Sequence, residues 1–114
     1  MTPTQVYKKF DRQSKKIGKQ KFQSMLDRIC KNHNVMRVEA GEMTDENEKE
    51  FAAYVLFEYD SSVEKCGAAY RNFEEARLDV ICFLQVFGLT LAYECNGDGD
   101  GILMSYRIVE DYNS

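Results

Sequence analysis

Hydrophobic and polar residues recur along this chain with two different periods, which divide it into helical and extended segments. In residues 1–34 the apolar positions fall three and four apart, as on one face of a helix. Thr2 and Gln5 have the spacing of a capping box, which marks a helix start. Gly18 interrupts the periodicity among lysines, so we predict two short helices that meet at Gly18 and end near Asn34.

Residues 35–60 show the period of two that is typical of strands. The first strand is expected over residues 35–40 and the second over residues 51–59, with the polar residues 41–50 between them as a loop. The second strand has apolar side chains on both faces, which predicts that both faces are covered. Those on one face are Phe51, Ala53, Val55, Phe57 and Tyr59, and those on the other are Tyr54 and Leu56.

Residues 61–88 are expected to hold one long helix over residues 63–87, which begins at a capping box of Ser61 and Glu64. Its last two turns, residues 80–87, are apolar nearly all round, as in a helix that is buried on every side. We expect the sheet to cover one side and the N-terminal helices the other. The alternative is an exposed apolar interface for a second copy of the chain or another partner. The residues of that interface would be Ile81, Phe83 and Val86.

A second hairpin is predicted over residues 89–110, because two strand-like segments flank a run of Asn-Gly and Asp-Gly pairs. The order of helices, hairpin, helix and hairpin predicts an α+β fold, a small antiparallel sheet covered by helices. We predict a single domain over residues 1–114, in which residues 1–34 form a basic helical layer. The order of the strands across the sheet does not follow from this pattern.

Composition narrows the class of protein. The 114 residues are 44% hydrophobic and 30% charged, which excludes a disordered or fibrous chain. No segment approaches the ~18 consecutive apolar residues of a membrane span, and the first residues lack the apolar core of a secretory signal. The four cysteines form no CxxC pair. We therefore expect a cytoplasmic protein with reduced thiols and no membrane contact.

Charge is divided unequally between the two parts of the chain. Residues 1–31 carry nine bases and two acids, a net of +7, whereas the whole chain has a formal net charge of −4. Acids are dense in a second segment, which holds Glu39, Glu42, Asp45, Glu46, Glu48 and Glu50. This division suggests two surfaces of opposite charge that are offered to partners. The alternative is a basic layer docked on an acidic body, with the remaining charges simply solvated.

Two patterns suggest metal chemistry, and each of them is incomplete. Asn96, Asp98 and Asp100 match the first half of a calcium loop, but position twelve of that loop is Arg107 and not a glutamate. Cys30 and His33 are half of a zinc site with no second pair. No nucleophile elbow or phosphate loop is present. We therefore predict no cofactor and no catalysis, with a small enzyme as the third function considered.

The leading function predicted from the sequence is a non-catalytic protein–protein interaction domain whose acidic segment binds a basic protein. An acidic inhibitor of a nucleic-acid-handling enzyme, of the kind encoded by phages, mobile elements or immunity systems, fits the size and charge. The alternative is a nucleic-acid-binding protein that uses the basic helices. Its contacts would be Lys15, Lys16, Lys19 and Lys21, with Tyr7, Phe10 and Phe22 interleaved as stacking partners.

Overall fold

The helices and strands follow one another in the order that the periodicity predicts. The computed structural model describes residues 2–44, 51–59, 66–97 and 103–111. Helices and an antiparallel sheet pack together in a small α+β domain, which confirms the predicted fold class. The helices in this part of the chain are α1 (Pro3–Ile17), α2 (Lys19–Asn32) and α3 (Cys66–Gln85), and the strands are β1 (Arg37–Thr44), β2 (Phe51–Glu58), β3 (Leu89–Gly97) and β4 (Leu103–Glu110).

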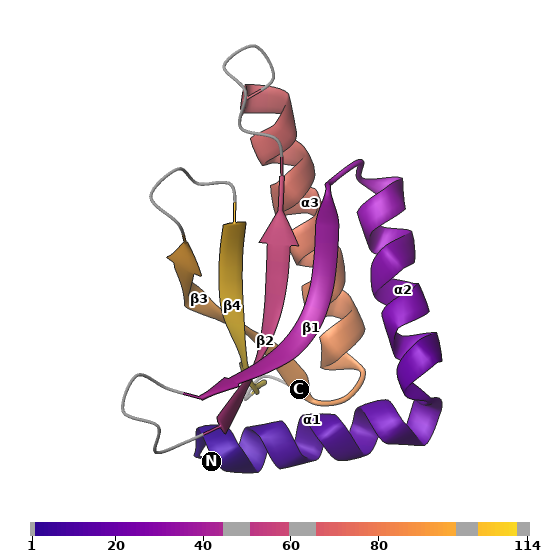
Figure 1. Cartoon of the computed structure of the whole chain (residues 1–114), viewed down its shortest axis with the longest axis vertical. Coiled ribbons are helices and arrows are strands. Elements are labelled where there is room, and N and C mark those ends of the chain that lie inside the picture. Colours follow the sequence, from indigo (N-terminus) through magenta and orange to yellow (C-terminus); the bar gives the residue numbers. More distant parts are fainter. Residues whose placement is uncertain (1, 45–50, 60–65, 98–102, 112–114) are drawn as a thin grey trace.

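Two helices and the bend between them form the N-terminal part. The predicted capping box at the start of α1 is confirmed: Thr2 Oγ1 accepts from the Gln5 backbone N–H at 3.2 Å, and Gln5 Oε1 accepts from the Thr2 N–H at 2.9 Å. Gly18 separates α1 from α2 with a φ of +94°, a conformation that favours glycine. This bend turns α2 away from α1, so that α1 runs below the strand ends and α2 rises beside β1 (Figure 1).

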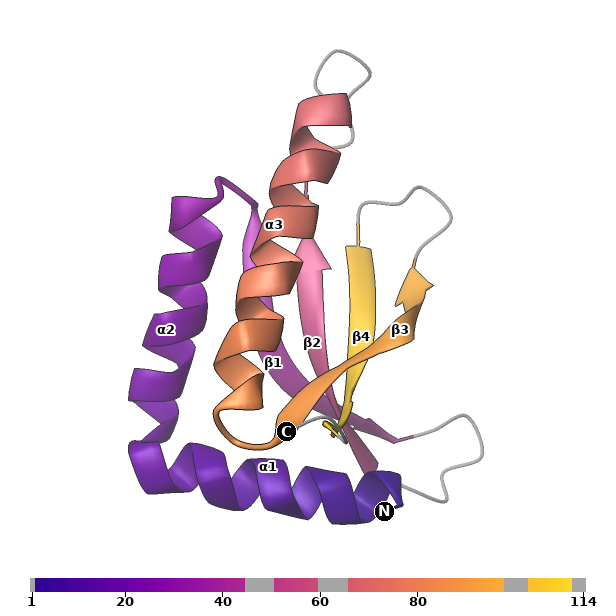
Figure 2. The same ribbon diagram turned by 180° about the vertical axis from the view of Figure 1, so that it is seen from behind.

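The sheet has the strand order β1-β2-β4-β3, with every neighbouring pair antiparallel. Both predicted hairpins form, and β2 and β4 join them in the centre. Helix α3 crosses one face of this sheet (Figure 2). No described element covers the opposite face, where Tyr54 and Leu56 are half-buried. The prediction that β2 is covered on both sides is therefore wrong for the part of the chain that the structure describes.

Strand β1 is longer than the sequence predicts. Residues 41–44 were expected in a loop, yet Gly41 pairs with Tyr54 and Thr44 pairs with Phe51 in an unbroken ladder. Backbone hydrogen bonds to β2 outweigh the low strand propensity of glycine and glutamate at these positions. Glu42 consequently lies in a strand, with its side chain on the same face as Val38 and Ala40.

Aromatic and aliphatic residues of α3 and β2 form the centre of the core. Phe73, Val80 and Leu84 on α3 are fully buried, as are Val55 and Phe57 on β2. The Phe73 ring lies 5.4 Å from that of Phe57, in an edge-on contact. Phe73, Val80 and Leu84 thus form an inward stripe on the predicted long helix, and Val55 and Phe57 share one face of β2 as predicted. The predicted start of that helix, with Ser61 and Glu64, lies outside the described residues.

The apolar end of α3 is covered by the sheet and by α2. The ring of Phe22 on α2 lies 5.0 Å from that of Phe83, which confirms the expected cover by the N-terminal helices. Burial on every side is wrong, however, because Val86 is 78% exposed and Cys82 is exposed too. Of the three residues of the alternative apolar interface, Ile81 and Phe83 pack against the core and Val86 alone is exposed. No helix in the described residues is long and apolar enough to cross a membrane.

The second hairpin also extends beyond its predicted strands. Asn96 pairs with Ser105 and Gly97 with Met104, so β3 continues into the Asn-Gly pair that was expected to lie between the strands. Asn96 is thus a strand residue, while Asp98 and Asp100 lie outside the described residues, so the incomplete calcium loop stays untested.

Candidate nucleic-acid interface and an adjoining cleft

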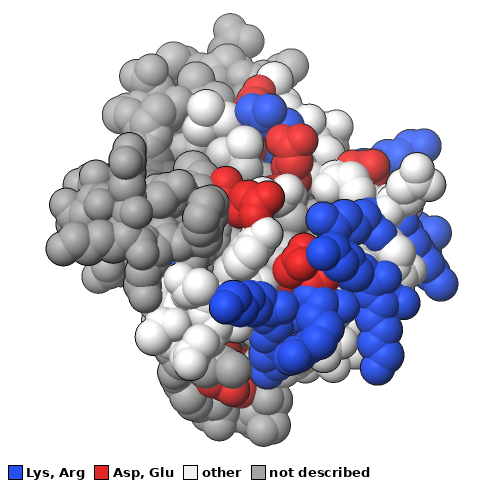
Figure 3. All heavy atoms as spheres, turned by 60° about the horizontal axis from the view of Figure 1, so that its bottom comes forward, with Lys and Arg blue, Asp and Glu red and all other residues white. Residues whose placement is uncertain are grey.

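Six cations on the outer sides of α1 and α2 form a feature that we call the cationic ridge. On each helix they recur at intervals that keep them on one side, away from the buried residues Val6, Phe22 and Leu26. All six are exposed. In Figure 3, Lys and Arg side chains gather over this part of the molecule. The ridge consists of Lys8, Arg12 and Lys16 on α1 and Lys21, Arg28 and Lys31 on α2.

Other cations of the two helices have acidic partners. Lys15 Nζ lies 2.9 Å from the Asp11 carboxylate, and Lys19 Nζ lies 3.6 Å from it. The hydrogen bond from Lys15 is the main reason that the pKa of Asp11 is lowered. Lys9 Nζ lies 3.9 Å from Glu110. None of the six ridge residues forms an ion pair with a residue that the structure describes. The charge of the ridge is therefore uncompensated in this part of the chain.

The structure thus divides the four lysines that the sequence singled out. Lys16 and Lys21 belong to the ridge, whereas Lys15 and Lys19 neutralise Asp11. The aromatic residues interleaved with them face inward: Phe22 is 4% exposed, and its ring lies 5.3 Å from that of Phe10 in an edge-on contact. The expected exposed stacking surface is therefore not formed by Phe22.

The acidic segment is described only in part. Glu39 lies 3.5 Å from Arg37 in an ion pair, and Glu42 accepts a hydrogen bond from the Tyr7 hydroxyl. Its other four members, Asp45, Glu46, Glu48 and Glu50, lie outside the described residues. The two described acids are on opposite faces of β1, so the structure does not bring them together into one acidic surface.

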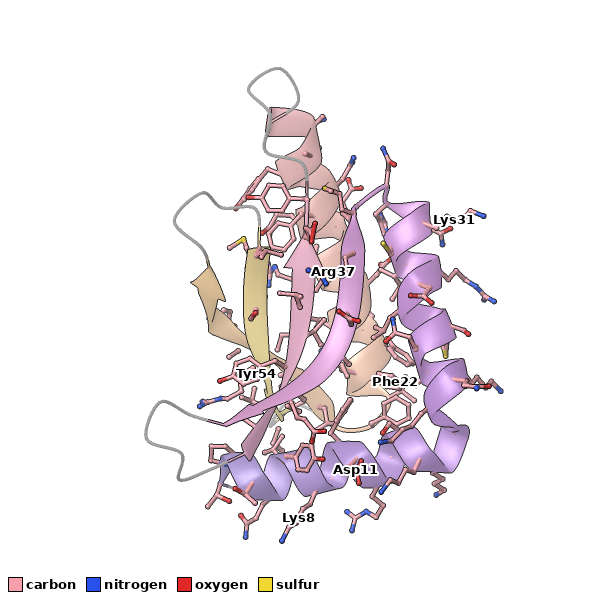
Figure 4. The ribbon with its side chains drawn as sticks, in the orientation of Figure 1. Lys8, Asp11, Phe22, Lys31, Arg37 and Tyr54 are labelled. Carbon is pink, nitrogen blue, oxygen red and sulfur yellow. The ribbon has the colours of Figure 1, made fainter. Side chains whose placement is uncertain are left out.

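A cleft of about 260 Å³ lies where α1, α2 and β1 meet, and we call it the corner cleft. In Figure 4, Asp11 and Phe22 point into the angle between the two helices, whereas Lys8 and Lys31 point away from it. Sequence reasoning missed this cleft, because its residues come from three elements and no local pattern marks them. The residues that line it are Tyr7, Phe10, Asp11, Ser14, Lys19, Phe22, Gln23, Ala40, Gly41 and Glu42.

The polar groups of the corner cleft are held in place by neighbours. Ser14 Oγ donates to the Asp11 carbonyl at 3.0 Å, and Gln23 Nε2 donates to the Asp27 carboxylate at 2.9 Å. The hydrogen bond to Glu42 is the largest cause that raises the pKa of Tyr7 to about 12, and burial adds to it. The Tyr7 hydroxyl thus lies near the Glu42 carboxylate, and both side chains line the cleft.

The Tyr7–Glu42 hydrogen bond makes stability depend on alkaline pH. Because the folded-state pKa of Tyr7 lies above the ordinary value of 10.0, the stability that this bond contributes is fully present below pH 10 and is lost as the pH rises towards 12. We expect the Tyr7→Phe variant to lose less stability than the wild type between pH 10 and 12, as measured by urea unfolding at several pH values. Parallel losses in both proteins would contradict the assignment of this hydrogen bond.

The half zinc site that the sequence suggested is divided between two environments. Cys30 Sγ donates to the Val35 carbonyl at 3.1 Å, while His33 Nε2 lies 2.5 Å from the Asp79 carboxylate on α3. His33 Nδ1 also lies 3.6 Å from Glu75, so this side chain links the end of α2 to α3. Within the described residues, no group of three histidine, cysteine, aspartate or glutamate side chains could hold a metal ion.

Comparison of the chain with models of known protein families, with curated proteins and with solved structures gives no match. Its function is consequently inferred from the chemistry of its own surface. Two features of that surface have a defined chemistry: the cationic ridge, which suits a polyanion, and the corner cleft beside it, which is lined by the carboxylates of Asp11 and Glu42.

Proposed function

We propose that this protein binds nucleic acid, and that the cationic ridge holds the phosphate backbone. The observation that carries the proposal is a set of six exposed lysine and arginine side chains on two consecutive helices, without an ion-pair partner in the described residues. Cations that already have a carboxylate partner gain little from a phosphate, whereas unpaired cations release counterions from the nucleic acid when they bind. The free ridge residues, and not every base of the segment, would therefore supply the affinity.

The arrangement of the ridge suits a long anion. Helix α1 has 15 residues and is about 22 Å long, a length over which a DNA strand presents a phosphate every ~3.4 Å. Lys8, Arg12 and Lys16 are four residues apart, which places neighbouring Cβ atoms about 6 Å from each other. The three ridge residues of α2 extend this line around the bend at Gly18. Flexible side chains at this spacing can contact successive phosphates without reading the sequence.

The negative net charge of the whole chain is compatible with this proposal. At physiological salt the Debye length is ~8 Å, while the longest dimension of the molecule is 42 Å. A phosphate at the ridge therefore experiences mainly the local charge of α1 and α2, which hold nine bases and two acids. The distant acids are screened. Their effect is expected to appear mainly as slower association at low ionic strength.

The interpretation of the chain as an acidic inhibitor of a nucleic-acid-handling enzyme stays a prediction. Its binding residues were to be the acids of residues 39–50, of which Glu39 and Glu42 alone are described. Both of these have partners within the protein, Arg37 and Tyr7. The described surface supports nucleic-acid binding by the cationic ridge more directly, because none of the six ridge residues has an ion-pair partner among the described residues.

Binding to nucleic acid should depend strongly on salt. If all six ridge residues contact phosphates, the logarithm of the association constant should fall with the logarithm of salt concentration with a slope of about −5 on duplex DNA. Affinity would then drop about 1,000-fold between 50 and 200 mM salt. Fluorescence anisotropy with labelled duplexes and single strands of mixed sequence would measure both quantities.

Two results would contradict the proposal. One is the absence of binding to duplex and single-stranded nucleic acid at 50 mM salt. The other is equally tight binding to polyglutamate of matched length, which would reassign the cationic ridge to an acidic protein partner. A basic polymer such as polylysine serves as the opposite control, because tight binding to it would favour the acidic segment of residues 39–50 as the interface.

A further inference from the structure

The two carboxylates of the corner cleft differ in how far their charge is compensated. Asp11 is neutralised by Lys15 and Lys19 on its own side of the cleft. Glu42 has the neutral hydroxyl of Tyr7 as its hydrogen-bond donor, and no cation forms an ion pair with it in the described residues. A carboxylate has about four acceptor positions, of which Tyr7 occupies one. Glu42 can therefore accept further hydrogen bonds from a ligand.

The surroundings of Glu42 select the type of ligand. Lys19 lines the same cleft and Lys15 is bonded to Asp11 there, so both of these cations already have a carboxylate partner. A ligand that combines N–H donors with nearby negative charge therefore suits Glu42 together with the unpaired cations of the cationic ridge. A nucleotide has this combination, since its base carries the donors and its phosphate the charge.

The walls and size of the corner cleft suit one base. Phe10 and Ala40, which are half-buried, contribute apolar surface against which a flat base can pack. The volume of about 260 Å³ lies below the ~300–1,000 Å³ of pockets for drug-sized ligands. A single base fits this volume better than a larger group. Because a stacked base is inaccessible, that base would come from a single-stranded segment.

The hydrogen-bonding edge of guanine matches a carboxylate best. Its Watson–Crick edge presents two adjacent donors, N1–H and the N2 amino group, which meet the two oxygens of one carboxylate. Adenine and cytosine place a bare acceptor nitrogen next to their amino group, and uracil places its single N–H between two carbonyls. Those acceptors would face the negative Glu42 side chain and be repelled.

We propose that the corner cleft binds one unstacked guanine of a single-stranded nucleic acid, with Glu42 accepting from N1–H and N2–H and Tyr7 holding the carboxylate in position. This inference rests on the proposed function, because the cationic ridge supplies the phosphate contacts that bring the strand to the cleft. The ridge gives affinity without sequence preference, and Glu42 adds a preference for guanine at one position.

The test compares single-stranded oligouridines that differ in one central base. Wild-type protein should bind the guanine-containing strand at least about fivefold more tightly than the adenine-containing strand. Inosine, which is guanine without the N2 amino group, should lose most of that preference in the unaltered protein. The Glu42→Gln variant should bind the guanine-containing and adenine-containing strands alike. Tyr7→Phe should reduce the preference without abolishing it.

A matched control is Glu39→Gln, which makes the same change of charge on the same strand but on the opposite face. It should keep the full guanine preference. If wild-type protein binds every strand equally, the inference about guanine is wrong, but the proposed binding of nucleic acid by the cationic ridge is kept. If it binds no nucleic acid, the proposed function and the inference are both wrong. Equal binding of guanine and inosine strands would also overturn it, whether or not the variants fold. Tighter binding of agmatine than of guanosine monophosphate would reassign the cleft to a cation.

Discussion

Reversing the charge of Lys16 and Lys21 together is expected to weaken nucleic-acid binding at least about tenfold at low salt. Both side chains are exposed and belong to the cationic ridge, and neither forms an ion pair with a described residue. The Lys16→Glu and Lys21→Glu changes should therefore leave the fold intact, since surface substitutions away from such contacts seldom alter stability by more than ~0.5 kcal/mol. The salt slope should shrink in magnitude by about 2, one for each lost phosphate contact.

The control for this variant changes the net charge equally at other places. Arg71→Glu with Arg107→Glu also lowers the net charge by four, but Arg71 lies on α3 and Arg107 on β4. Both arginines are exposed, as the ridge residues are. Binding should fall much less in this variant, because screening limits the influence of distant charges. Equal losses in the two variants would show that net charge, and not the ridge, controls binding.

The largest effect on stability is expected for Phe22→Ala. Phe22 is 4% exposed, and its ring contacts Phe10 on α1 as well as Phe83 and Phe87 at the end of α3. Removing the ring would leave a cavity between three parts of the chain and lower the free energy of unfolding by about 3–5 kcal/mol. Urea unfolding followed by circular dichroism measures this loss.

Val86→Ala is the matched control, since Val86 lies in the same part of the molecule and is 78% exposed. It should change the free energy of unfolding by no more than ~0.5 kcal/mol. If Phe22→Ala costs no more than Val86→Ala, the N-terminal helices do not stabilise the end of α3, and the assigned cover would be wrong.

Local patterns were sufficient to predict most of the secondary structure. The capping box at Thr2, the break at Gly18 and the inward stripe of α3 depend on residues within one or two turns of each other. The hairpins follow from alternating residues on either side of short polar connections. Errors arose where pairing across the sheet decided the result, as at residues 41–44, which β2 holds in a strand.

The candidate site was predicted only in its composition. An excess of lysine and arginine in residues 1–31 is evident from the sequence, and the ion pair of Asp11 with Lys15 follows the helical spacing of four. The distinction between paired and free lysines does not follow from helical spacing, because Lys19 reaches Asp11 only across the bend at Gly18. The sequence also did not predict that Phe22 points towards the core and away from the lysines beside it.

The sequence by itself determined the order of elements, the α+β class and the concentration of positive charge on the N-terminal helices, because periodicity, capping and charge are local properties. The tertiary structure alone decided the strand order β1-β2-β4-β3, the face of the sheet that no described element covers, and the corner cleft. Tyr7 and Glu42 are far apart in the chain and come close only because α1 packs against β2, the neighbour of β1 in the sheet. Contacts of this kind depend on the packing of whole elements, which no short stretch of sequence encodes.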